Sequence, residues 1–310
     1  MSAAAPLPGT RLGPYTLERL LGQGGFAWVF AGQRDDAKSF AVKVLKPRYA
    51  ADPAFESRFR QEAAFAAELI HPSIIHIEDV GGESGLAWFT MDLYTDSVSQ
   101  RLADDALMPE AEAVRIALGV TEALAFAHGR NVIHRDIKPD NVLLGEDGRV
   151  ILSDFGIARV VSGYVAATGF MMTIGTPAYI SPEQAQGRAA DGRSDLYSLG
   201  IMLYRMVVGE VPFRSRDWFE LARMHVEERP EPPRARRPEI SKRLERIILR
   251  LLAKHPNDRH ASAIALAEDL ADMQDRTRLT ADLPVPEGYL RDSKAVRSEE
   301  ADDKKWWKVW

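Results

Sequence analysis

Apolar and polar positions separate the chain into a strand-rich first part and a helix-rich second part. Short apolar runs bounded by glycine and polar residues predict strands over 15–21, 28–31, 39–45 and 86–93. Longer stretches predict helices over 53–70, 109–129, 196–208, 218–228, 244–254 and 262–273. The helix over 109–129 has clear end signals, with Pro109 at its start and Gly129 at its end.

A charged residue interrupts the apolar face of the first predicted helix. Phe55, Phe59, Ala66 and Leu69 fall on one face, and Glu62 completes that stripe. A carboxylate on an apolar face is costly unless it has a partner. Glu62 therefore either pairs with a cation or reaches solvent.

Composition narrows the class of protein. A chain of 310 residues exceeds the usual single core and suggests two lobes or domains, and 45% hydrophobic residues allow a sizeable core to be buried. The net charge of -5 argues against nucleic acid or anionic lipid as the main ligand. Cysteine is absent, which excludes disulfides and thiolate metal sites and suits a reducing cytoplasm. We see no secretory signal at the N-terminus and no run of eighteen apolar residues that would span a membrane.

The first predicted hairpin has a glycine-rich turn. Its strand is interrupted at Gly22, Gly24 and Gly25 and resumes near Trp28. Glycine lets backbone N–H groups approach an anion closely, as a loop folded over a triphosphate requires. The alternative is an ordinary hairpin turn.

Two short motifs carry the chemistry. The run HRDIKPDN over 134–141 supplies Asp136 and Asn141, and the run SDFG that follows supplies Asp154. Phosphoryl transfer from ATP needs one carboxylate to orient the attacking hydroxyl, here Asp136. It also needs an amide oxygen and a second carboxylate to hold Mg²⁺, here Asn141 and Asp154. Each residue alone could be a polar loop residue, but the two motifs in this order favour catalysis.

These motifs resemble those of the protein kinase family. The runs HPSII, GTPAYISPEQA and RSDLYSLG are most similar to those of bacterial Hanks-type serine/threonine kinases. The resemblance covers Gly13 to Asp275 and implies the α+β, bilobal kinase fold. It implies a β-rich N-lobe over 13–93 with one main helix and a mostly helical C-lobe over 94–275. A disordered tail over 1–12 and a flexible, juxtamembrane-like linker and tail over 276–310 complete the expected organisation.

The resemblance implies how ATP is bound. Lys43, braced by Glu62, would grip the α and β phosphates. Met91 occupies the gatekeeper position, and Ala27 replaces the third glycine of the family's loop, which we expect to alter nucleotide affinity without abolishing it. The implied nucleotide-binding residues are Gly22, Gln23, Gly24, Gly25, Val29, Ala41, Lys43, Met91, Asp92, Tyr94 and Leu143. The backbone of Asp92 and Tyr94 would contact the adenine edge.

The resemblance also implies the reaction. The catalytic residues would be Asp136, Lys138, Lys43 and Glu62, acting on ATP and Mg²⁺, with Mn²⁺ able to substitute. Lysine two residues after the catalytic aspartate is typical of the serine/threonine members, where it contacts the γ-phosphate. The implied substrates are Ser and Thr hydroxyls of proteins.

The segment from Asp154 to Glu183 resembles a kinase activation segment. Thr176 would lie in the loop that receives the substrate and would bridge Asp136 and Lys138. Arg135 marks the kinases that respond to phosphorylation of this segment, because a guanidinium forks two hydrogen bonds onto a phosphate. We expect autophosphorylation at Thr168 first and at Thr173 second.

Three further residues have structural roles by resemblance. Glu183 would pair with Arg259 in the large lobe. Asp195 would brace the backbone of the HRD motif. From the residues alone, Asp195 could equally be the N-cap of the helix over 196–208.

Two segments remain outside these motifs. The proline-rich and arginine-rich run over 229–240 predicts an extended solvated loop and, less favoured, a docking site. The final KKWWKVW over 304–310 places lysines beside tryptophans, as at the cytoplasmic side of a membrane interface. The natural protein would then continue beyond Trp310 into a membrane anchor, with the kinase domain in the cytoplasm. The alternative is a disordered tail.

Two rival functions share most of these features. A pseudokinase scaffold would keep the fold and lack a catalytic residue, yet none is missing here. A small-molecule phosphotransferase would not carry the segment GTPAYISPE. Expected partners are protein substrates and a second copy for trans-autophosphorylation, with no nucleic acid.

Overall fold

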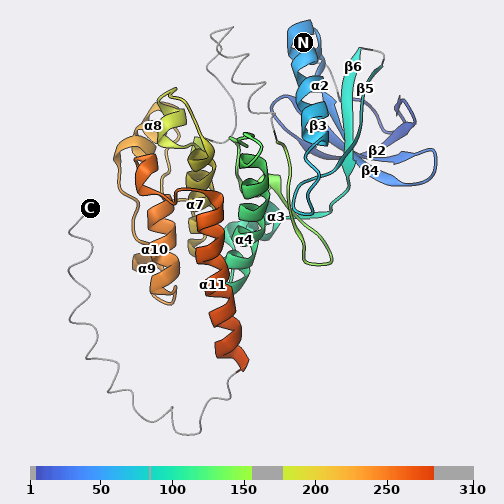
Figure 1. The fold of residues 1–310 in the computed structure, drawn as a ribbon. Helices are drawn as coiled ribbons and strands as arrows, with labels where there is room; N and C mark the ends of the chain where they lie inside the picture. The colour runs from blue at the N-terminus through green and yellow to red at the C-terminus, as the bar shows by residue number, and fades with distance from the viewer. Residues whose placement is uncertain (1–4, 84, 156–176, 283–310) are drawn as a thin grey trace, which may run out of the picture.

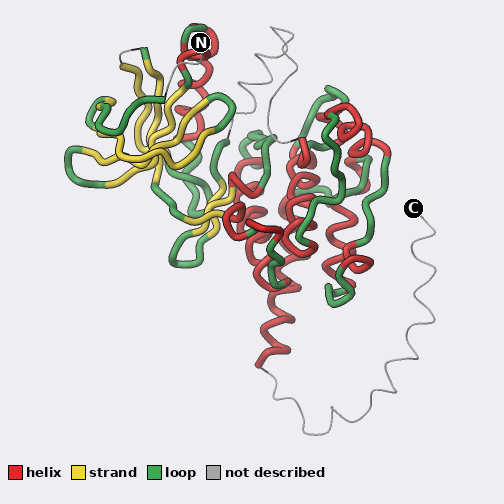
Figure 2. Tube along the Cα trace, turned by 180° about the vertical axis from the view of Figure 1, so that it is seen from behind, coloured by secondary structure: helices red, strands yellow, loops and turns green. Residues whose placement is uncertain are grey.

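The computed structural model describes residues 5–83, 85–155 and 177–282, which form two lobes (Figure 1). The smaller lobe is a curled sheet with α2 lying against it, and the larger lobe is a group of helices. The expected α+β, bilobal architecture is confirmed. The lobes meet at a small second sheet, whose strands lie between them in Figure 2.

The sheet of the smaller lobe has six strands in the order β1-β2-β3-β4-β6-β5, all antiparallel. Its strands are β1 Arg11–Leu12, β2 Tyr15–Gln23, β3 Ala27–Arg34, β4 Ser39–Leu45, β5 Ile77–Glu83 and β6 Leu86–Asp92. Because side chains alternate along a strand, β4 contributes to two cores. Phe40, Val42 and Val44 enter an outer apolar cluster, whereas Ala41 and Leu45 enter the main core between sheet and helices.

Helix α2, Pro53–Ala67, covers the inner face of this sheet. Asp52 begins it, since its side chain accepts hydrogen bonds from the N–H groups of Ala54 and Phe55. The short helix α1, Pro47–Ala50, precedes it. The buried residues of α2 are Phe55, Phe59, Ala63 and Ala66, so the predicted apolar stripe does face the core.

The expected N-terminal tail differs from the structure over residues 5–12. Arg11 and Leu12 form β1, which pairs with the start of β2. Leu12 is buried in the outer cluster beside Tyr15, and Ala5 packs against that cluster. Burial of Leu12 stabilises a segment whose sequence alone reads as a polar, proline-containing tail.

The larger lobe is built on α7, Gly192–Val208, which is buried along most of its length. Around it pack α4 Glu110–His128, α10 Lys242–Leu251 and α11 Ala263–Asp282. Gly200 permits the close approach of α10, because a Cβ there would lie 2.6 Å from the Cβ of Leu251.

Shorter elements complete this lobe. The second sheet consists of β7 Asp96–Ser97, β8 Val142–Leu144 and β9 Val150–Leu152. The short helices are α3 Val98–Arg101, α6 Pro182–Ala185, α8 Trp218–Glu227 and α9 Pro233–Arg236. Single 3-10 turns are η1 Ala103–Asp105, η2 Pro139–Asn141, η3 Pro177–Tyr179 and η4 Pro256–Asp258.

Two segments differ from their predicted structure. Helix α11 continues to Asp282, so the first residues of the expected linker are helical. The run over 229–240 is not wholly extended, because Pro233 begins the one-turn helix α9. Proline suits the first turn of a helix, which explains why a proline-rich run can start one.

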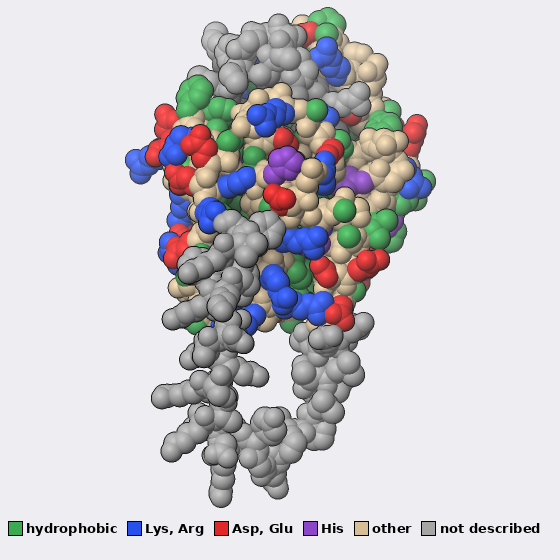
Figure 3. Space-filling view, turned by 60° about the vertical axis from the view of Figure 1, so that its left-hand side comes forward, with side chains coloured by type: hydrophobic (Ala, Val, Ile, Leu, Met, Phe, Trp, Pro, Cys, Tyr) green, Lys and Arg blue, Asp and Glu red, His purple; other side chains and the backbone are tan. Residues whose placement is uncertain are grey.

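Charges of both signs mix on the surface. Figure 3 shows Lys and Arg side chains interspersed with Asp and Glu side chains on one face of the molecule. Surface ion pairs include Arg223 with Glu228 at 2.6 Å and Arg243 with Asp272 at 2.5 Å. Such exposed pairs contribute about 0–1 kcal/mol each to folding.

Candidate active site

The loop before β8 brings together three of the predicted site residues, the catalytic candidates Asp136 and Lys138 and the metal-ligand candidate Asn141. Lys138 Nζ lies 2.7 Å from Asp136 Oδ2. Asn141 Nδ2 donates to the same carboxylate oxygen at 3.1 Å and to the carbonyl oxygen of Asp136 at 2.8 Å. Burial alone would lower the pKa of Lys138, but the surrounding carboxylates, Asp136 foremost, together outweigh it and raise that pKa. Lys138 therefore carries a positive charge beside Asp136 at neutral pH.

The hydrogen bonds of Asn141 fix the direction of its amide. Because Nδ2 points to Asp136, the side-chain oxygen of Asn141 is the atom directed elsewhere. An amide oxygen and a carboxylate are ligands that Mg²⁺ accepts. The residue types thus fit a divalent cation, with Asn141 and Asp154 as its candidate ligands.

Lys43 and Asp154 meet between the lobes. Lys43 stands on β4, largely buried, and its Nζ lies 2.6 Å from Asp154 Oδ1. Burial opposes charge on Asp154, but the nearby positive charges, Lys43 foremost and then Lys138, together outweigh it and lower the pKa of the carboxyl. Asp154 is therefore ionised, as a cation ligand must be.

Glu62 lies half-buried on α2, on the face that the sequence predicted. The hydrogen-bonded partner of Lys43 in the described residues is Asp154. The pairing of Glu62 with Lys43 therefore stays a prediction.

Asp195 holds the backbone of the loop over 134–141, called the catalytic loop from here on. Its side chain is buried, and the residue is 1% exposed. Its two carboxylate oxygens accept the backbone N–H groups of His134 at 2.9 Å and Arg135 at 2.7 Å. His128 of α4 adds a third contact through Nε2 at 2.8 Å. The alternative role of Asp195 as an N-cap is wrong, because Asp191 caps α7 and accepts from the N–H of Arg193.

Two residues of this site have left-handed backbones. Arg135 has φ of 68° and Asp154 has φ of 65°. This conformation is unfavourable for residues with a Cβ, by about 1–2 kcal/mol. The hydrogen bonds that the backbone N–H groups of His134 and Arg135 donate to Asp195 offset that strain at Arg135.

His134 connects the two chemical motifs. Its Nδ1 accepts from the N–H of Asp136 at 3.2 Å, so its Nε2 carries the proton and donates to the carbonyl oxygen of Ser153 at 2.7 Å. Its ring also meets Phe155 edge-on at 4.6 Å. With both nitrogens occupied and the side chain fully buried, His134 positions the loops and is not a general base.

The glycine-rich turn lies between β2 and β3. Gly22 belongs to β2, where it pairs with Val29, so the turn itself is shorter than the sequence suggested. A Cβ at Gly22 would meet no described atom within 4 Å, and one at Gly24 would meet only the carbonyl oxygen of Ala27 at 3.6 Å. Packing within the described protein does not require glycine at Gly22, so the open space beside it fits an approaching ligand.

The other predicted nucleotide-binding residues lie on β2, β3, β4, β6 and β8 and in the connections that adjoin these strands. Ala41 on β4 pairs with Met91 on β6, and Leu143 on β8 packs against the same core from the larger lobe. Met91 also lines a small apolar cavity under α2 that extends to Asp154. Of the remaining predicted positions, Gln23 ends β2, Asp92 ends β6, and Gly25 and Tyr94 lie in the adjoining connections.

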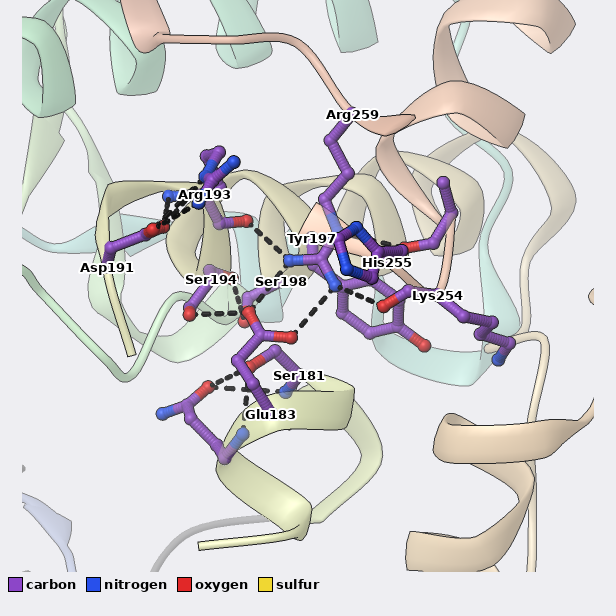
Figure 4. A network of polar contacts seen from close by, with 12 residues as sticks. Ser181, Glu183, Asp191, Arg193, Ser194, Tyr197, Ser198, Lys254, His255 and Arg259 are labelled. Carbon is purple, nitrogen blue, oxygen red and sulfur yellow. Dashed lines mark hydrogen bonds and ion pairs between the residues drawn. The ribbon is translucent and has the colours of Figure 1, made fainter. Parts of the chain in front are cut away.

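Glu183 and Arg259 form a buried ion pair (Figure 4). Two guanidinium nitrogens of Arg259 donate to the two carboxylate oxygens at 2.8 and 2.9 Å, and Ser194 donates to Glu183 at 2.6 Å. Arg259 also donates to the carbonyl oxygens of Ala253, Arg193 and Lys254, so all its N–H groups are used. Burial opposes charge on Glu183, but Arg259 and Ser194 outweigh it and lower its pKa.

Sequence reasoning missed two positioning residues, Gln184 and His128. Ser181 caps α6 and forms a reciprocal capping box with Gln184. Gln184 then donates to the carbonyl oxygen of Arg135 at 3.1 Å and so joins α6 to the catalytic loop. The signal was present as Ser-x-x-Gln. His128 gave no signal, because only the fold brings it to Asp195.

Three predicted residues lie outside the described residues. They are the phosphorylation candidates Thr168 and Thr173 and the substrate-loop residue Thr176. Within 5–83, 85–155 and 177–282, no helix is both long and apolar enough to cross a bilayer.

Comparison with known proteins agrees with this geometry. The sequence model of the protein kinase domain matches residues 15–273. The chain therefore belongs to the protein kinase family, whose members use ATP and a divalent metal.

Bacterial relatives narrow the class. The serine/threonine-protein kinase PknB of Mycobacterium leprae is 40% identical over 264 residues, which is 83% of this chain and 42% of that protein. The serine/threonine-protein kinase pkn3 of Myxococcus xanthus is 40% identical over 268 residues, or 83% of this chain and 49% of that protein. The chain is thus a Hanks-type kinase of the bacterial serine/threonine class, and it spans less than half the length of these relatives.

A solved structure has the same fold. The crystal structure of the Mycobacterium tuberculosis PknI kinase domain is 32% identical with a TM-score of 0.69. The structural match includes 87% of the present chain and 100% of the PknI chain. Fold and sequence comparisons therefore identify the same family.

Proposed function

We propose that this chain transfers the γ-phosphate of ATP to Ser and Thr hydroxyls of proteins. One observation carries the proposal. Asp136, Lys138 and Asn141 form one hydrogen-bonded group, and the ionised Asp154 is held by Lys43 where the lobes meet. Phosphoryl transfer needs this combination of a hydroxyl-orienting carboxylate, phosphate-binding cations and two cation ligands.

Each residue has a distinct task in this mechanism. Asp136 accepts a hydrogen bond from the substrate hydroxyl and aims its oxygen at the γ-phosphorus. Lys138, charged and adjacent, offsets the negative charge of the transferring group. Lys43 binds the α and β phosphates, and Glu62 orients it. Asn141 and Asp154 would hold Mg²⁺, or Mn²⁺ in its place, and the bound cation would offset negative charge on the phosphates.

The test measures phosphotransfer by Asp154→Asn and Lys43→Met variants. Each substitution removes a contact to charge that develops during transfer, so turnover should fall on the order of 10²-fold or more while the circular dichroism spectrum is unchanged. Lys38→Met, on the exposed end of the same hairpin, is a matched control and should keep wild-type turnover. A folded Asp154→Asn variant with more than about a tenth of wild-type turnover would contradict the proposal.

Identification of the labelled residue distinguishes the rival functions. Label on Ser or Thr of added protein supports the proposal, and label mainly on Tyr contradicts the assignment to serine and threonine. A pseudokinase would bind nucleotide without transferring label. A small-molecule phosphotransferase would leave proteins unlabelled.

We also propose that the chain activates itself by phosphorylating Thr168, and secondarily Thr173. A phosphothreonine adds about two negative charges, which the Arg135 guanidinium can bind. Thr176 would contact Asp136 and Lys138 in the active form, and a second copy would act as the phosphorylating enzyme. If a Thr168/Thr173 double alanine variant matches wild type in initial rate after ATP preincubation, this switch does not exist.

Attachment to the inner face of the membrane is a separate proposal, and it rests on sequence. Lys304, Lys305 and Lys308 would meet anionic headgroups, while the neighbouring tryptophans settle at the interface. Sedimentation with anionic vesicles should then decrease on deletion of residues 304–310. Unchanged sedimentation would favour a tail without membrane affinity.

A further inference from the structure

The segment after β4 holds the glycine-rich turn by three successive carbonyl groups. Lys46 Nζ donates to the carbonyl oxygen of Gly24 at 2.6 Å. Arg48 Nη2 donates to that of Gly25 at 3.0 Å. The backbone N–H of Lys46 donates to that of Phe26 at 2.8 Å. The entire tip of the turn is therefore bonded to residues at the start of α1.

Lys46 approaches the turn from the outer side of the sheet. Side chains alternate along β4, and Val44 belongs to the outer cluster whereas Lys43 faces Asp154. Lys46 lies two residues after Val44, and its side chain is on the same outer side, since its ammonium lies 5.7 Å from the ring centre of Trp28 in the outer cluster. The carbonyl of Gly24 thus points away from the face that carries Lys43.

This direction determines where the N–H groups of the turn point. All described peptide bonds are trans, and in a trans peptide the C=O and the following N–H point in opposite directions. Lys46 and Arg48 donate hydrogen bonds to the carbonyl oxygens of Gly24 and Gly25. The N–H groups of Gly25 and Phe26, which belong to the same two peptide groups, therefore point away from Lys46 and Arg48. Adjacent N–H groups directed to one side form an anion-binding concavity.

The contacts that hold the turn are buried and include aromatic packing. Lys46 is only 9% exposed, and burial together with the nearby Arg48 lowers its pKa. A hydrogen bond is electrostatically stronger in such a desolvated place than in water. The ring of Phe26 packs on Tyr49 at 5.0 Å and on Phe55 at 5.9 Å, so the tip is also fixed to α1 and α2.

We propose that Lys46, assisted by Arg48, is a positioning residue that turns the N–H groups of Gly25 and Phe26 toward the phosphates of ATP. The inference rests on the proposed kinase function and adds two residues that none of the recognised motifs contains. Lys46 touches the loop backbone and not the nucleotide. It therefore affects ligands that carry phosphates and spares those that do not.

The experiment compares two ligands on the full chain. In Lys46→Met, which keeps the length of the side chain and removes its donor, the Kd for MgATP should rise about tenfold, the usual effect of one charge-assisted hydrogen bond. The Kd for adenosine should stay at the wild-type value. The KM for ATP should rise more than kcat falls. Lys46→Arg retains a donor and should restore most of the MgATP affinity.

A charge-matched control separates geometry from long-range attraction. Arg58 is exposed on α2, and Arg58→Met removes one positive charge from the same lobe. Equal losses of MgATP affinity in Lys46→Met and Arg58→Met would overturn the inference, as would an unchanged affinity in Lys46→Met or an equal loss for adenosine. If folded wild-type protein fails to bind MgATP, the proposed function fails instead.

Discussion

Arg259 shows how much one residue can depend on its partners. Its side chain is 0% exposed, and each of its donors meets an oxygen of Glu183 or of the backbone. A buried guanidinium is costly without such pairing, and the remaining carboxylate is equally costly if the guanidinium is removed. The pair therefore makes the connection between α6 and the loop before α11 intolerant of single changes.

Arg259→Met should lower the free energy of unfolding by about 3–5 kcal/mol, because Glu183 is left charged and buried. Urea unfolding followed by circular dichroism measures it. The double variant Glu183→Gln/Arg259→Met should recover part of the loss. Arg223→Met, which breaks an exposed pair with Glu228, should change stability by less than about 1 kcal/mol. Similar losses in both single variants would refute the argument.

The residues of the site were predictable to different degrees. Asp136, Asn141 and Asp154 stand in motifs whose spacing alone indicates phosphoryl transfer. The partners Glu183 and Arg259 followed only from family resemblance, since nothing local links them. Lys46 could not be predicted, because a lysine at a strand end usually faces solvent, and its contact with Gly24 depends on how the hairpin folds back.

At the scale of elements, glycine determines how α7 ends. Gly209 follows the helix with φ of 92°, the left-handed conformation that closes many helices. A Cβ there would lie 3.0 Å from the carbonyl oxygen of Asp105 and 3.1 Å from Leu107 Cδ2. Backbone conformation and packing thus both favour glycine at this position.

Gly209→Ala should destabilise the fold by about 2 kcal/mol, from the left-handed backbone and the crowding against Asp105 together. Gly187→Ala is the matched control, since Gly187 has φ of 66° and open space around its Cα. Gly187→Ala should lose only the stability that the left-handed backbone costs a residue with a Cβ, about 1 kcal/mol. Denaturant midpoints at constant m-value would report both. A larger loss in the control would show that crowding is unimportant.

Element boundaries were predicted best where capping signals are local. Helix α4 runs between Pro109 and Gly129 as expected. The start of α7 was placed too late, because Asp191 and Asp195 are both acceptable N-caps and only the tertiary contact with the catalytic loop distinguishes them. Strand β1 was missed, since burial of Leu12 depends on residues far along the chain.

Acid stability is a property of the whole molecule. His225 is fully buried, with its Nδ1 3.0 Å from the Tyr197 hydroxyl, its ring against Phe213, and Lys254 bonded to its carbonyl oxygen. Burial, reinforced by the positive charge of Lys254, lowers its pKa from 6.5 to about 3. In this range the unfolded chain binds a proton that the folded protein does not, so folding loses stability as pH falls below 6.5.

From pH 7 to pH 5 this single residue should cost on the order of 2 kcal/mol of unfolding free energy. Glu183 and Asp154, whose pKa values are also lowered, add losses of the same sign at lower pH. His225→Gln removes the titration, so its stability should fall less than that of wild type over the same interval. Urea titrations at the two pH values measure the difference. Parallel declines in the two proteins would show that His225 does not titrate as described.

His134 joins the HRDIKPDN and SDFG motifs through its hydrogen bonds to Asp136 and Ser153. This connection affects how the two segments open on the slow timescale of hydrogen exchange. Ser153 also donates to the carbonyl oxygen of Asn141, through its N–H at 2.9 Å and its hydroxyl at 3.1 Å. The segment Ser153–Phe155 thus cannot leave the catalytic loop without breaking several bonds at once. Amide hydrogens of both segments should exchange with deuterium as a single cooperative unit, with one common free energy of opening.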